Sequence, residues 1–344
     1  WEKRVLTNGG KYHQILEQSL AAYLDVPHLS LFNNGTTALI AALQSFGLKG
    51  EVITTPFSFV ATSHAILYNN LTPVFVDVDP YTSNIDPLCI EAAITENTSA
   101  ILAVHCYGIP ADVHRINDIA NKYSLKVIYD AAHAFGVQCD CGSILNHGDS
   151  SILSFHATKV FNTFEGGAVI STSADHKALI DKIRNFGIEN EYKISRLGLN
   201  GKISEFNSAL GILQLNYIDD YINKRRQIAL TYNQQLADIP GISVLPIDKH
   251  LRANYAYYPI IVHDDYPISA SELCDKLLAK HIVCRRYFYP LITDSTVYSS
   301  LLASPPKTPN ARILADQVIC LPIFPDLTYT VVNHILNLIA NPLA

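Results

Sequence analysis

The run Pro73-Val-Phe-Val-Asp-Val78 is short, almost continuously apolar and rich in β-branched residues. A run of this kind, without alternation of polar and apolar residues, is typical of a strand buried on both faces of a parallel sheet. Similar runs recur on either side of it, and segments with helical spacing separate them. We expect strands over 28–32, 51–54, 73–78, 100–104 and 125–129. We expect helices over 36–46, 59–68, 87–93 and 113–123.

This alternation predicts an α/β fold, a mainly parallel sheet with right-handed crossovers and helices on both faces. The pattern changes after about residue 170. There we expect a long helix over 204–236, an alternating strand over 254–263, a helix over 269–281 capped by Ser269 or Ser271, and a final helix over 328–340. We predict a large α/β domain over 1–225 and a smaller α+β domain over 226–344.

Composition narrows the class of protein. The chain has 344 residues, is 49% hydrophobic and 16% charged, and carries a net charge of −6. This balance indicates a globular protein with a substantial core, and it weighs against nucleic acid or an anionic membrane as a partner. No apolar run approaches the roughly 18 residues of a membrane span. The sequence from Trp1 shows no secretory leader, so we expect a cytoplasmic location.

The cysteines give no clear metal pattern. Cys139-Asp-Cys141 is a C-x-C pair without a second pair, so we predict no metal site. We expect the seven cysteines to be thiols in a reducing compartment. They stand at positions 89, 106, 139, 141, 274, 284 and 320.

Three segments at predicted strand ends carry candidate chemistry, because open α/β sheets bind ligands beyond the carboxyl ends of their strands. The first is Asn33-Asn-Gly-Thr-Thr-Ala38, which leads into a helix. The free N–H groups of a helix start, with Gly35 allowing close approach, form an anion site. Thr36 and Thr37 add hydroxyls to it. Taken alone, the segment is equally compatible with an ordinary N-cap.

The second segment is Tyr129-Asp-Ala-Ala-His-Ala-Phe-Gly136. Asp130 follows an apolar strand, and small alanines follow Asp130, as a flat ligand would require. The carboxylate is suited to holding a positively charged heterocyclic nitrogen, and His133 could face the same space. A capping Asp beside a packed His is the plainer alternative.

The third segment runs from Ser151 to Lys159 and on to the pair Gly166-Gly167. A Lys in such a polar turn can lose its proton by desolvation and become a nucleophile toward carbonyls. Taken alone, Lys159 could equally be a surface residue. Together, a phosphate cradle, an Asp and a Lys on successive strand ends are what pyridoxal 5'-phosphate requires.

These segments resemble the DegT/DnrJ/EryC1/StrS sugar aminotransferases, a branch of the aspartate-aminotransferase (fold type I) enzymes. The similar stretches follow the order of that family along most of the chain. They are 6–10, 34–39, 55–62, 73–78, 130–134, 154–159, 165–168 and 198–202. The resemblance implies an aspartate-aminotransferase-like fold with a seven-stranded sheet, and a homodimer with shared active sites.

The resemblance also implies residue roles. Lys159 would be the Schiff-base lysine and proton shuttle, and Asp130 would pair with the pyridinium nitrogen. Other cofactor contacts are implied at these positions: Thr36, Thr37 and Ser154 on the phosphate, Phe59 stacked on the ring, His133 near the ring hydroxyl, and Asn200 on the phosphate of the neighbouring subunit. A dehydratase branch has His in place of the lysine, so Lys159 disfavours that activity.

Within the family, the segments 154–167 and 285–290 resemble the enzymes that aminate C4 of dTDP-4-keto-6-deoxy-D-glucose with L-glutamate as donor. The resemblance implies a role in O-antigen or other surface-glycan synthesis. Arg285, Arg286, Tyr287 and Tyr289 could meet a sugar nucleotide through charge and stacking. A structural strand with an Arg pair is the alternative for this segment.

The nucleotide and the carbon remain open on physical grounds. A GDP- or UDP-linked sugar, or a 3-keto sugar, would suit the same chemistry. A catalytically silent regulatory protein with this fold is a further alternative, which the intact Lys159 and Asp130 disfavour.

Overall fold

The computed structural model describes residues 9–302 and 304–343, so residues 6–8 of the first family-like stretch lie outside the described part. The strands are β1 (His28–Phe32), β2 (Glu51–Thr54), β3 (Thr72–Phe75), β4 (Thr98–Val104), β5 (Lys126–Asp130), β6 (Gln138–Cys139), β7 (Gly142–Ser143), β8 (Ser150–Ser154), β9 (Gly167–Ser171), β10 (Ile188–Asn190), β11 (Lys193–Ile194), β12 (Ile242–Val244), β13 (Tyr258–Val262) and β14 (Val318–Leu321). The α-helices are α1 (Lys11–Leu24), α2 (Gly35–Ser45), α3 (Val60–Tyr68), α4 (Pro87–Ala92), α5 (Val113–Tyr123), α6 (Ala174–Arg184), α7 (Glu205–Leu215), α8 (Ile218–Leu236), α9 (Ala270–Ala279), α10 (Thr296–Leu301), α11 (Pro309–Gln317) and α12 (Tyr329–Ala340). Three short 3-10 turns are η1 (Cys106–Gly108), η2 (Ile144–Asn146) and η3 (Ile292–Asp294).

The largest sheet has seven strands in the order β1-β9-β8-β5-β4-β2-β3. Neighbours from β3 across to β8 are parallel, and β9 is antiparallel to both β8 and β1. This arrangement confirms the predicted mainly parallel seven-stranded sheet. Its parallel strands end at one edge, which therefore gathers the segments that follow β1, β2, β4, β5 and β8.

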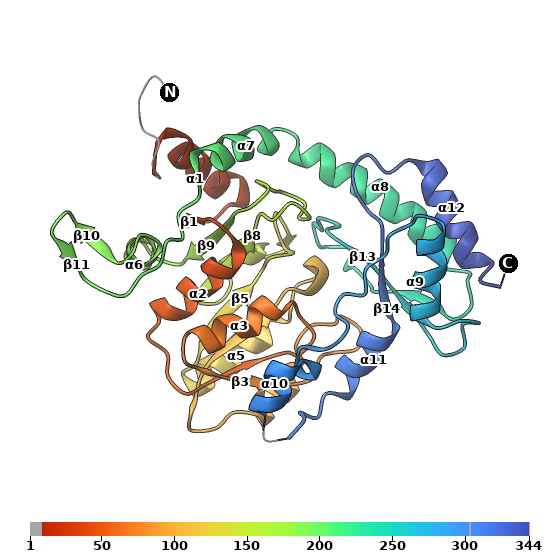
Figure 1. Ribbon diagram of the computed structural model, residues 1–344, viewed down its shortest axis with the longest axis horizontal. Helices are drawn as coiled ribbons and strands as arrows, with labels where there is room; N and C mark the ends of the chain where they lie inside the picture. The colour runs from red at the N-terminus through yellow and green to blue at the C-terminus, as the bar shows by residue number, and fades with distance from the viewer. Residues whose placement is uncertain (1–8, 303, 344) are drawn as a thin grey trace.

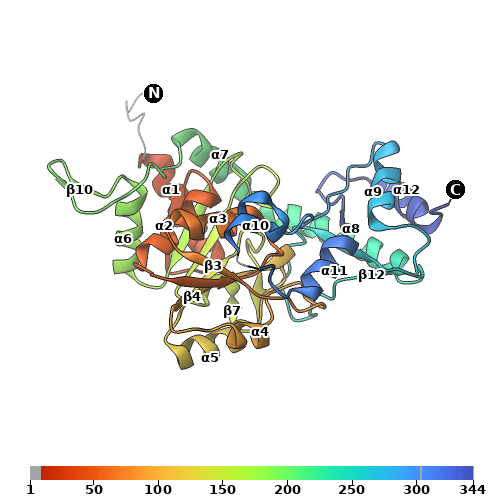
Figure 2. The same cartoon turned by 60° about the horizontal axis from the view of Figure 1, so that its bottom comes forward.

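Helices cover both faces of this sheet. On one face, residues of α1, α4 and α5 share a buried cluster with β5 side chains such as Val127 and Tyr129. On the other, residues of α2, α3 and α6 share a second cluster with Ile128 of β5. Figure 2 shows α2 and α3 above the strands and α4 and α5 below them. The alternation along β5 follows from the period of two in a strand.

A smaller antiparallel sheet, β12-β13-β14, forms a second core with α8, α9 and α12. Figure 1 shows these helices together at one end of the molecule, with the β10–β11 hairpin projecting at the other. Helix α8 connects the two cores, because Ile218 belongs to the first and Ile228 and Tyr232 belong to the second. We propose that the two domains meet within α8, near the division at residue 225 that the sequence predicts.

Three element predictions need correction. Strand β3 ends at Phe75, and Val78 makes only an isolated bridge with Ile85. The predicted helix over 204–236 is two helices, and α8 begins afresh with Asp219 and Asp220 in its first turn, where the helix dipole favours acidic groups. Strand β13 begins only at Tyr258 and is buried at every residue, because it is the central strand of its sheet. Of the two candidate caps of α9, Ser269 is the N-cap.

The prediction that all seven cysteines are thiols is also wrong. Cys139 and Cys141 are joined in a disulfide across the turn of the β6–β7 hairpin, with their Cα atoms 5.1 Å apart. The tight turn brings the two side chains together, which spacing in the sequence does not reveal. The other five cysteines are free thiols.

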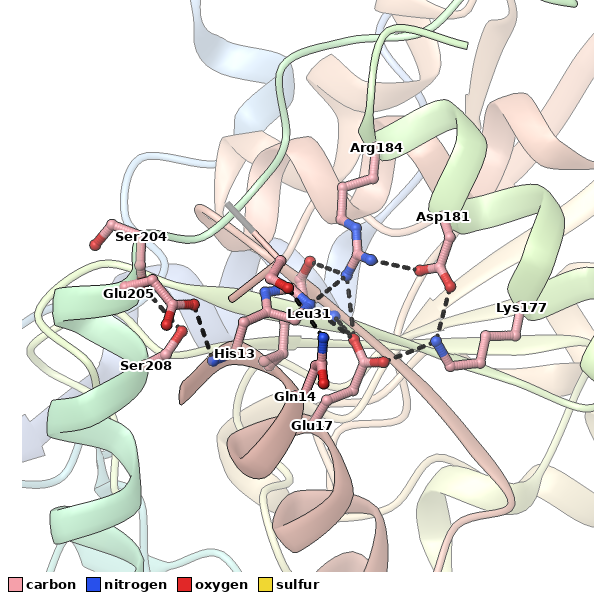
Figure 3. Close-up of polar contacts among 11 residues, drawn as sticks. His13, Gln14, Glu17, Leu31, Lys177, Asp181, Arg184, Ser204, Glu205 and Ser208 are labelled. Atoms are coloured by element: carbon pink, nitrogen blue, oxygen red, sulfur yellow. Dashed lines mark hydrogen bonds and ion pairs between the residues drawn. The ribbon is translucent and has the colours of Figure 1, made fainter. Parts of the chain in front are cut away.

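An ion-pair network fixes α1 and α6 against the sheet (Figure 3). Glu17 pairs with Lys177 at 2.8 Å and with Arg184 at 3.2 Å, and Arg184 also donates to the carbonyl of Leu31. Burial raises the pKa of Glu17, but the hydrogen bond with His13 and the charges of Arg184 and Lys177 outweigh this effect and hold the pKa well below its usual range. The network anchors β1, the strand that leads into the first candidate site segment.

Within the described ranges, no helix combines the length and the apolar character needed to cross a membrane.

Candidate active site

The carboxyl edge of the large sheet brings together the three segments selected from the sequence. Asp130 is the last residue of β5, and Ser154 is the last residue of β8, two strands that are hydrogen-bonded neighbours. Helix α2 begins at Gly35, just after β1. The predicted convergence of these segments therefore follows from the parallel order of the strands.

The start of α2 is packed tightly against the ends of β8 and β9. A Cβ on Gly35 would lie 2.9 Å from the Cβ of Ser154, and a Cβ on Gly167 would lie 2.7 Å from the carbonyl of Asn34. Only glycines permit this approach. The first turn of α2, with Thr36, is thus held beside Ser154, which forms a concave set of N–H and hydroxyl donors suited to an anion.

Some of the N–H and hydroxyl donors at the start of α2 already make hydrogen bonds within the loop 33–37. The backbone N–H of Thr37 donates to the Oδ1 of Asn34 at 2.8 Å, as in an N-cap, and the Thr37 hydroxyl donates to the Oδ1 of Asn33 at 2.5 Å. Thr37 therefore shapes the loop. The ordinary N-cap, one of the two alternatives at this segment, is therefore present, and the anion site stays a prediction.

Asp130 is a buried carboxylate without a close cationic partner in the described structure. Its Oδ2 accepts from the Thr62 hydroxyl at 2.7 Å, and its Oδ1 accepts from the N–H of Ala132 at 3.1 Å. Burial raises the pKa of Asp130, opposed by these hydrogen bonds and by the charge of Lys159. A cationic group placed beside the carboxylate would relieve this cost of burial.

Lys159 extends from the turn after β8 and its Nζ donates to the hydroxyl of Tyr257 at 3.1 Å. Burial lowers the pKa of Lys159 to about 8, against the opposing attraction of Asp130. About a tenth of this amine is therefore neutral at pH 7, far more than for a lysine with the usual pKa of 10.5, and the neutral form is the one that acts as nucleophile and proton acceptor.

We expect the amine of Lys159 in cofactor-free protein to react half-maximally with an acylating reagent near pH 8. Loss of the Tyr257 acceptor in Tyr257→Phe should lower that midpoint, because the ammonium loses a hydrogen bond. The unfolded chain holds this proton more tightly, so the contribution of Lys159 to stability should rise with pH between about 8 and 10.5.

Peptide mass spectrometry after labelling across a pH series measures the midpoint. The exposed end of Lys126, at the opposite edge of the sheet on β5, is the internal control. A Lys159 midpoint near 10.5, the ordinary value for lysine, would contradict the prediction.

His133 is buried beside these groups. Its Nδ1 accepts from the N–H of Tyr107 at 3.1 Å, so the neutral ring carries its proton on Nε2. Burial, and secondarily the charge of Lys159, hold the pKa of His133 well below its usual range. The ring stacks against Phe288 with centroids 6.0 Å apart and contacts Tyr257. His133 is therefore a neutral donor fixed next to Tyr257, the acceptor for Lys159.

A hollow of about 530 Å³ lies between Phe59 and the segment 284–292. Phe59 is the N-cap residue of α3, is 61% exposed, and lines this hollow. Arg285 lines the same hollow and is exposed. The segment is close to Lys159, because the rings of Tyr287 and Tyr257 lie 5.2 Å apart and the Tyr107 hydroxyl donates to the carbonyl of Tyr287.

The rest of this segment also has structural contacts. Arg286 donates to the carbonyls of Ala315 and Asp316 at 3.1 and 3.0 Å, and its guanidinium lies 3.7 Å from the centroid of the Tyr289 ring. The segment is not a strand, apart from one bridge between Arg285 and Cys320. Arg286 thus has the structural role that the sequence left open as an alternative for this Arg pair. Arg285 lines the hollow.

Asn200 is exposed, and its carbonyl accepts from the side chain of Asn33 at 3.2 Å in the same chain. The contact places the Asn200 loop against the segment that precedes α2. Its implied role toward a neighbouring subunit stays a prediction.

Sequence reasoning missed three residues that build this site. Thr62 supports Asp130, Tyr257 contacts Lys159, and Asn254 donates to the carbonyls of His133 and Phe135 at 2.8 and 3.0 Å. Thr62 lies in a stretch already selected for its resemblance. Tyr257 and Asn254 are about a hundred residues away from their partners, and no local pattern singles them out.

The fold and the site define an enzyme of the aspartate-aminotransferase-like class. Comparison with known proteins is more specific, because the DegT/DnrJ/EryC1/StrS aminotransferase family matches residues 1–340. The chain belongs to this family and is a transaminase.

The relatives agree with this assignment. The chain is 51% identical over 339 residues, 98% of its length and 92% of the relative, to a dTDP-4-amino-4,6-dideoxy-D-glucose transaminase of Shigella dysenteriae. It is 48% identical, over 98% of its length and 92% of the relative, to an enzyme of the same name from Escherichia coli. A crystal structure of DesI with its TDP-sugar product superposes with a TM-score of 0.93 at 33% identity, over 98% of this chain and 86% of that one.

Proposed function

We propose that this protein transfers the amino group of L-glutamate to C4 of dTDP-4-keto-6-deoxy-D-glucose, giving dTDP-4-amino-4,6-dideoxy-D-glucose and 2-oxoglutarate. The observation that carries the substrate assignment is the 51% identity over 98% of the chain to a transaminase of that name. The chemistry rests on Lys159 and Asp130, which lie at the same edge of the sheet. Lys159 would act as a neutral amine, and Asp130 would act as a negatively charged carboxylate.

The residues fit pyridoxal 5'-phosphate. The start of α2 beside Ser154 would provide a cradle for a phosphate, and its close packing depends on Gly35 and Gly167, where a Cβ would collide with Ser154 and with the backbone of Asn34. Asp130 lacks a close cationic partner, which a protonated pyridine nitrogen would supply. We propose that Thr36, Thr37 and Ser154 hold the phosphate, that Phe59 covers the ring, and that His133 lies near the ring hydroxyl. The bound cofactor would supply an electron sink for carbanion chemistry.

The work of the chain is proton transfer and charge placement. Lys159, whose neutral form is made accessible by its lowered pKa of about 8, takes the proton from the α-carbon of glutamate and later delivers a proton to C4 of the sugar. The negative charge of Asp130 would favour positive charge on a group bound beside it. Tyr257 holds the Nζ of Lys159 in place through their hydrogen bond.

We propose that the hollow between Phe59 and Arg285 receives the sugar nucleotide. Its single exposed guanidinium and its aromatic lining, which includes Tyr287 and Tyr289, suit a diphosphate and a base. Arg286 would act there mainly by holding Tyr289 in position, through the stacking of its guanidinium on that ring.

We further propose a homodimer. Exposed apolar side chains gather on the β10–β11 hairpin and on α7, where Tyr192 is 90% exposed and Phe206 is 73% exposed. Burial of these surfaces in a second copy would remove them from water. It would also place Asn200, which follows the hairpin, near the other subunit. A cytoplasmic location and a role in O-antigen synthesis complete the proposal, following from the nucleotide-sugar chemistry of the relatives.

The test is a reaction of the protein, loaded with pyridoxal phosphate, with L-glutamate and dTDP-4-keto-6-deoxy-D-glucose. We expect one amino-sugar nucleotide by mass spectrometry, with the nitrogen at C4 by NMR. The GDP- and UDP-linked 4-keto-6-deoxyhexoses, tested in parallel, should react much more slowly. Preferred turnover of either one, or amination at C3, would overturn the substrate assignment. A cofactor spectrum that no amino donor alters would favour the silent alternative.

A further inference from the structure

The β6–β7 hairpin and the η2 turn bring three sulfur and nitrogen ligands together outside the transaminase site. The Nε2 of His147 lies 3.3 Å from the Sγ of Cys141 and 4.0 Å from the Sγ of Cys139. All three ligand atoms lie within 4.8 Å of one another. Figure 2 places this hairpin on the side of the sheet where α4 and α5 lie. The proposed transamination gives this cluster no role.

The distances from His147 to the two sulfurs are close to those around a tetrahedral metal ion, while the sulfurs, bonded to each other in the disulfide, would have to separate on reduction. With Zn–S bonds near 2.3 Å and Zn–N bonds near 2.0–2.1 Å, tetrahedral sulfur and nitrogen ligands lie about 3.6 Å apart. The two distances from His147 to the sulfurs lie on either side of that value. Thiolate and imidazole are also the ligand types that zinc and similar thiophilic cations select.

The protein fixes the three ligands in place. Gln138 at the base of the hairpin exchanges backbone hydrogen bonds with Arg252, at 3.3 and 2.9 Å. The η2 turn is anchored by the buried Ile144 and Leu145, and the N–H of His147 donates to the carbonyl of Ile144. The ligands therefore need little rearrangement apart from separation of the sulfurs, which favours binding.

The cluster opens on a hollow of about 550 Å³ that Cys139, Cys141 and His114 line. The His114 ring lies across that of His147, with centroids 5.8 Å apart. The hollow gives a cation a path to the sulfurs and leaves a fourth coordination position accessible to water. Asp112 and Asp248 also line it, and their charges favour the approach of a cation.

We propose that the reduced Cys139 and Cys141, together with His147, bind one Zn²⁺ or similar thiophilic divalent cation per chain, and that the disulfide form does not. A phosphine reductant converts the disulfide and one water molecule into two thiols and a phosphine oxide. Metal binding then releases the two thiol protons, leaving two thiolates and a neutral imidazole as ligands. The expectation of no metal, based on C-x-C spacing alone, did not include His147, which only the fold brings to the pair.

The test uses protein loaded with pyridoxal phosphate, reduced with tris(carboxyethyl)phosphine, freed of reductant without air, and titrated with Co²⁺. We expect one Co²⁺ per chain by elemental analysis after dialysis. A thiolate-to-cobalt charge-transfer band should appear, with d–d bands at longer wavelength than the cofactor absorbs. Zn²⁺ should abolish these bands by displacement. Oxidised protein of the same sequence should bind no stoichiometric Co²⁺, and this comparison does not depend on the folding of any variant.

Variants define the ligand set. Cys141→Ser and His147→Ala should weaken Co²⁺ binding at least about 100-fold, the upper end of what loss of a supporting outer-shell group costs. Cys274→Ser on α9 and His334→Ala on α12 are the matched controls and should bind like the wild type. Failure of reduced wild-type protein to bind, equal binding by the oxidised form, or retained affinity in either ligand variant would overturn the proposal.

Discussion

Lys159→Ala protein should form the amino sugar at least about 10⁴-fold more slowly than the wild type, while it still binds pyridoxal phosphate without a covalent bond. The reason is that Lys159 holds the one largely buried amine at this sheet edge among the described residues, with its pKa lowered to about 8 mainly by burial. No neighbour can replace it as a proton carrier, because Tyr257 has its pKa raised far above the working range by burial.

The measurement is product formation from L-glutamate and the dTDP-linked keto sugar, with mass spectrometry after borohydride treatment to detect covalently held cofactor. Lys126→Ala is the matched control, because Lys126 begins β5, the strand that ends in Asp130, and therefore lies at the opposite edge of the sheet. Near-normal turnover by the Lys159→Ala protein would exclude the proposed function while leaving the metal-site proposal untouched.

Asp130→Asn should reduce kcat about 10³-fold with little change in the KM for the sugar nucleotide, because it removes a buried charge that acts on the cofactor and not on the nucleotide. Asparagine keeps the shape of the side chain. Its Oδ1 can still accept from the Ala132 N–H, while its Nδ2 would donate to the Thr62 hydroxyl, which can turn its own proton toward Ser58. The loss would therefore report the charge and not the packing.

The same substitution should affect stability in opposite ways with and without cofactor. Burial raises the folded-state pKa of Asp130, so its contribution to stability is complete below the unfolded pKa and is lost as the pH rises through the folded pKa. At neutral pH the cofactor-free Asp130→Asn protein should thus be at least as stable as the wild type.

Pyridoxal phosphate should raise the Tm of the wild type more than that of the variant, because only the wild type offers a carboxylate to the cationic ring nitrogen. Thermal unfolding with and without cofactor measures both effects. Asp118→Asn, on the exposed face of α5, is the control. An equal rise in Tm for Asp130→Asn and wild type would show that the carboxylate does not contact the cofactor.

Much of the large sheet was predictable because its signals are local. Apolar runs such as 125–129 end in polar residues, and parallel strands share a carboxyl edge, so Asp130 and Ser154 were expected at the same edge. The structure alone shows that their strands, β5 and β8, are neighbours there. Predictions failed where the boundary of a helix or strand depends on residues that are distant in the sequence. The break between α7 and α8 and the late start of β13 at Tyr258 depend on which core each residue joins.

The sequence by itself determined the α/β class, the order of the strand-end segments and the identities of Asp130 and Lys159, because periodicity and turn chemistry act over a few residues. Only the tertiary structure decided what surrounds them. It placed Tyr257 on Lys159, Thr62 on Asp130 and Arg286 on Tyr289, and it brought His147 to a cysteine pair that spacing alone left without a third ligand. These contacts join segments that are distant in sequence or related only through a turn, and packing of the folded chain alone brings them together.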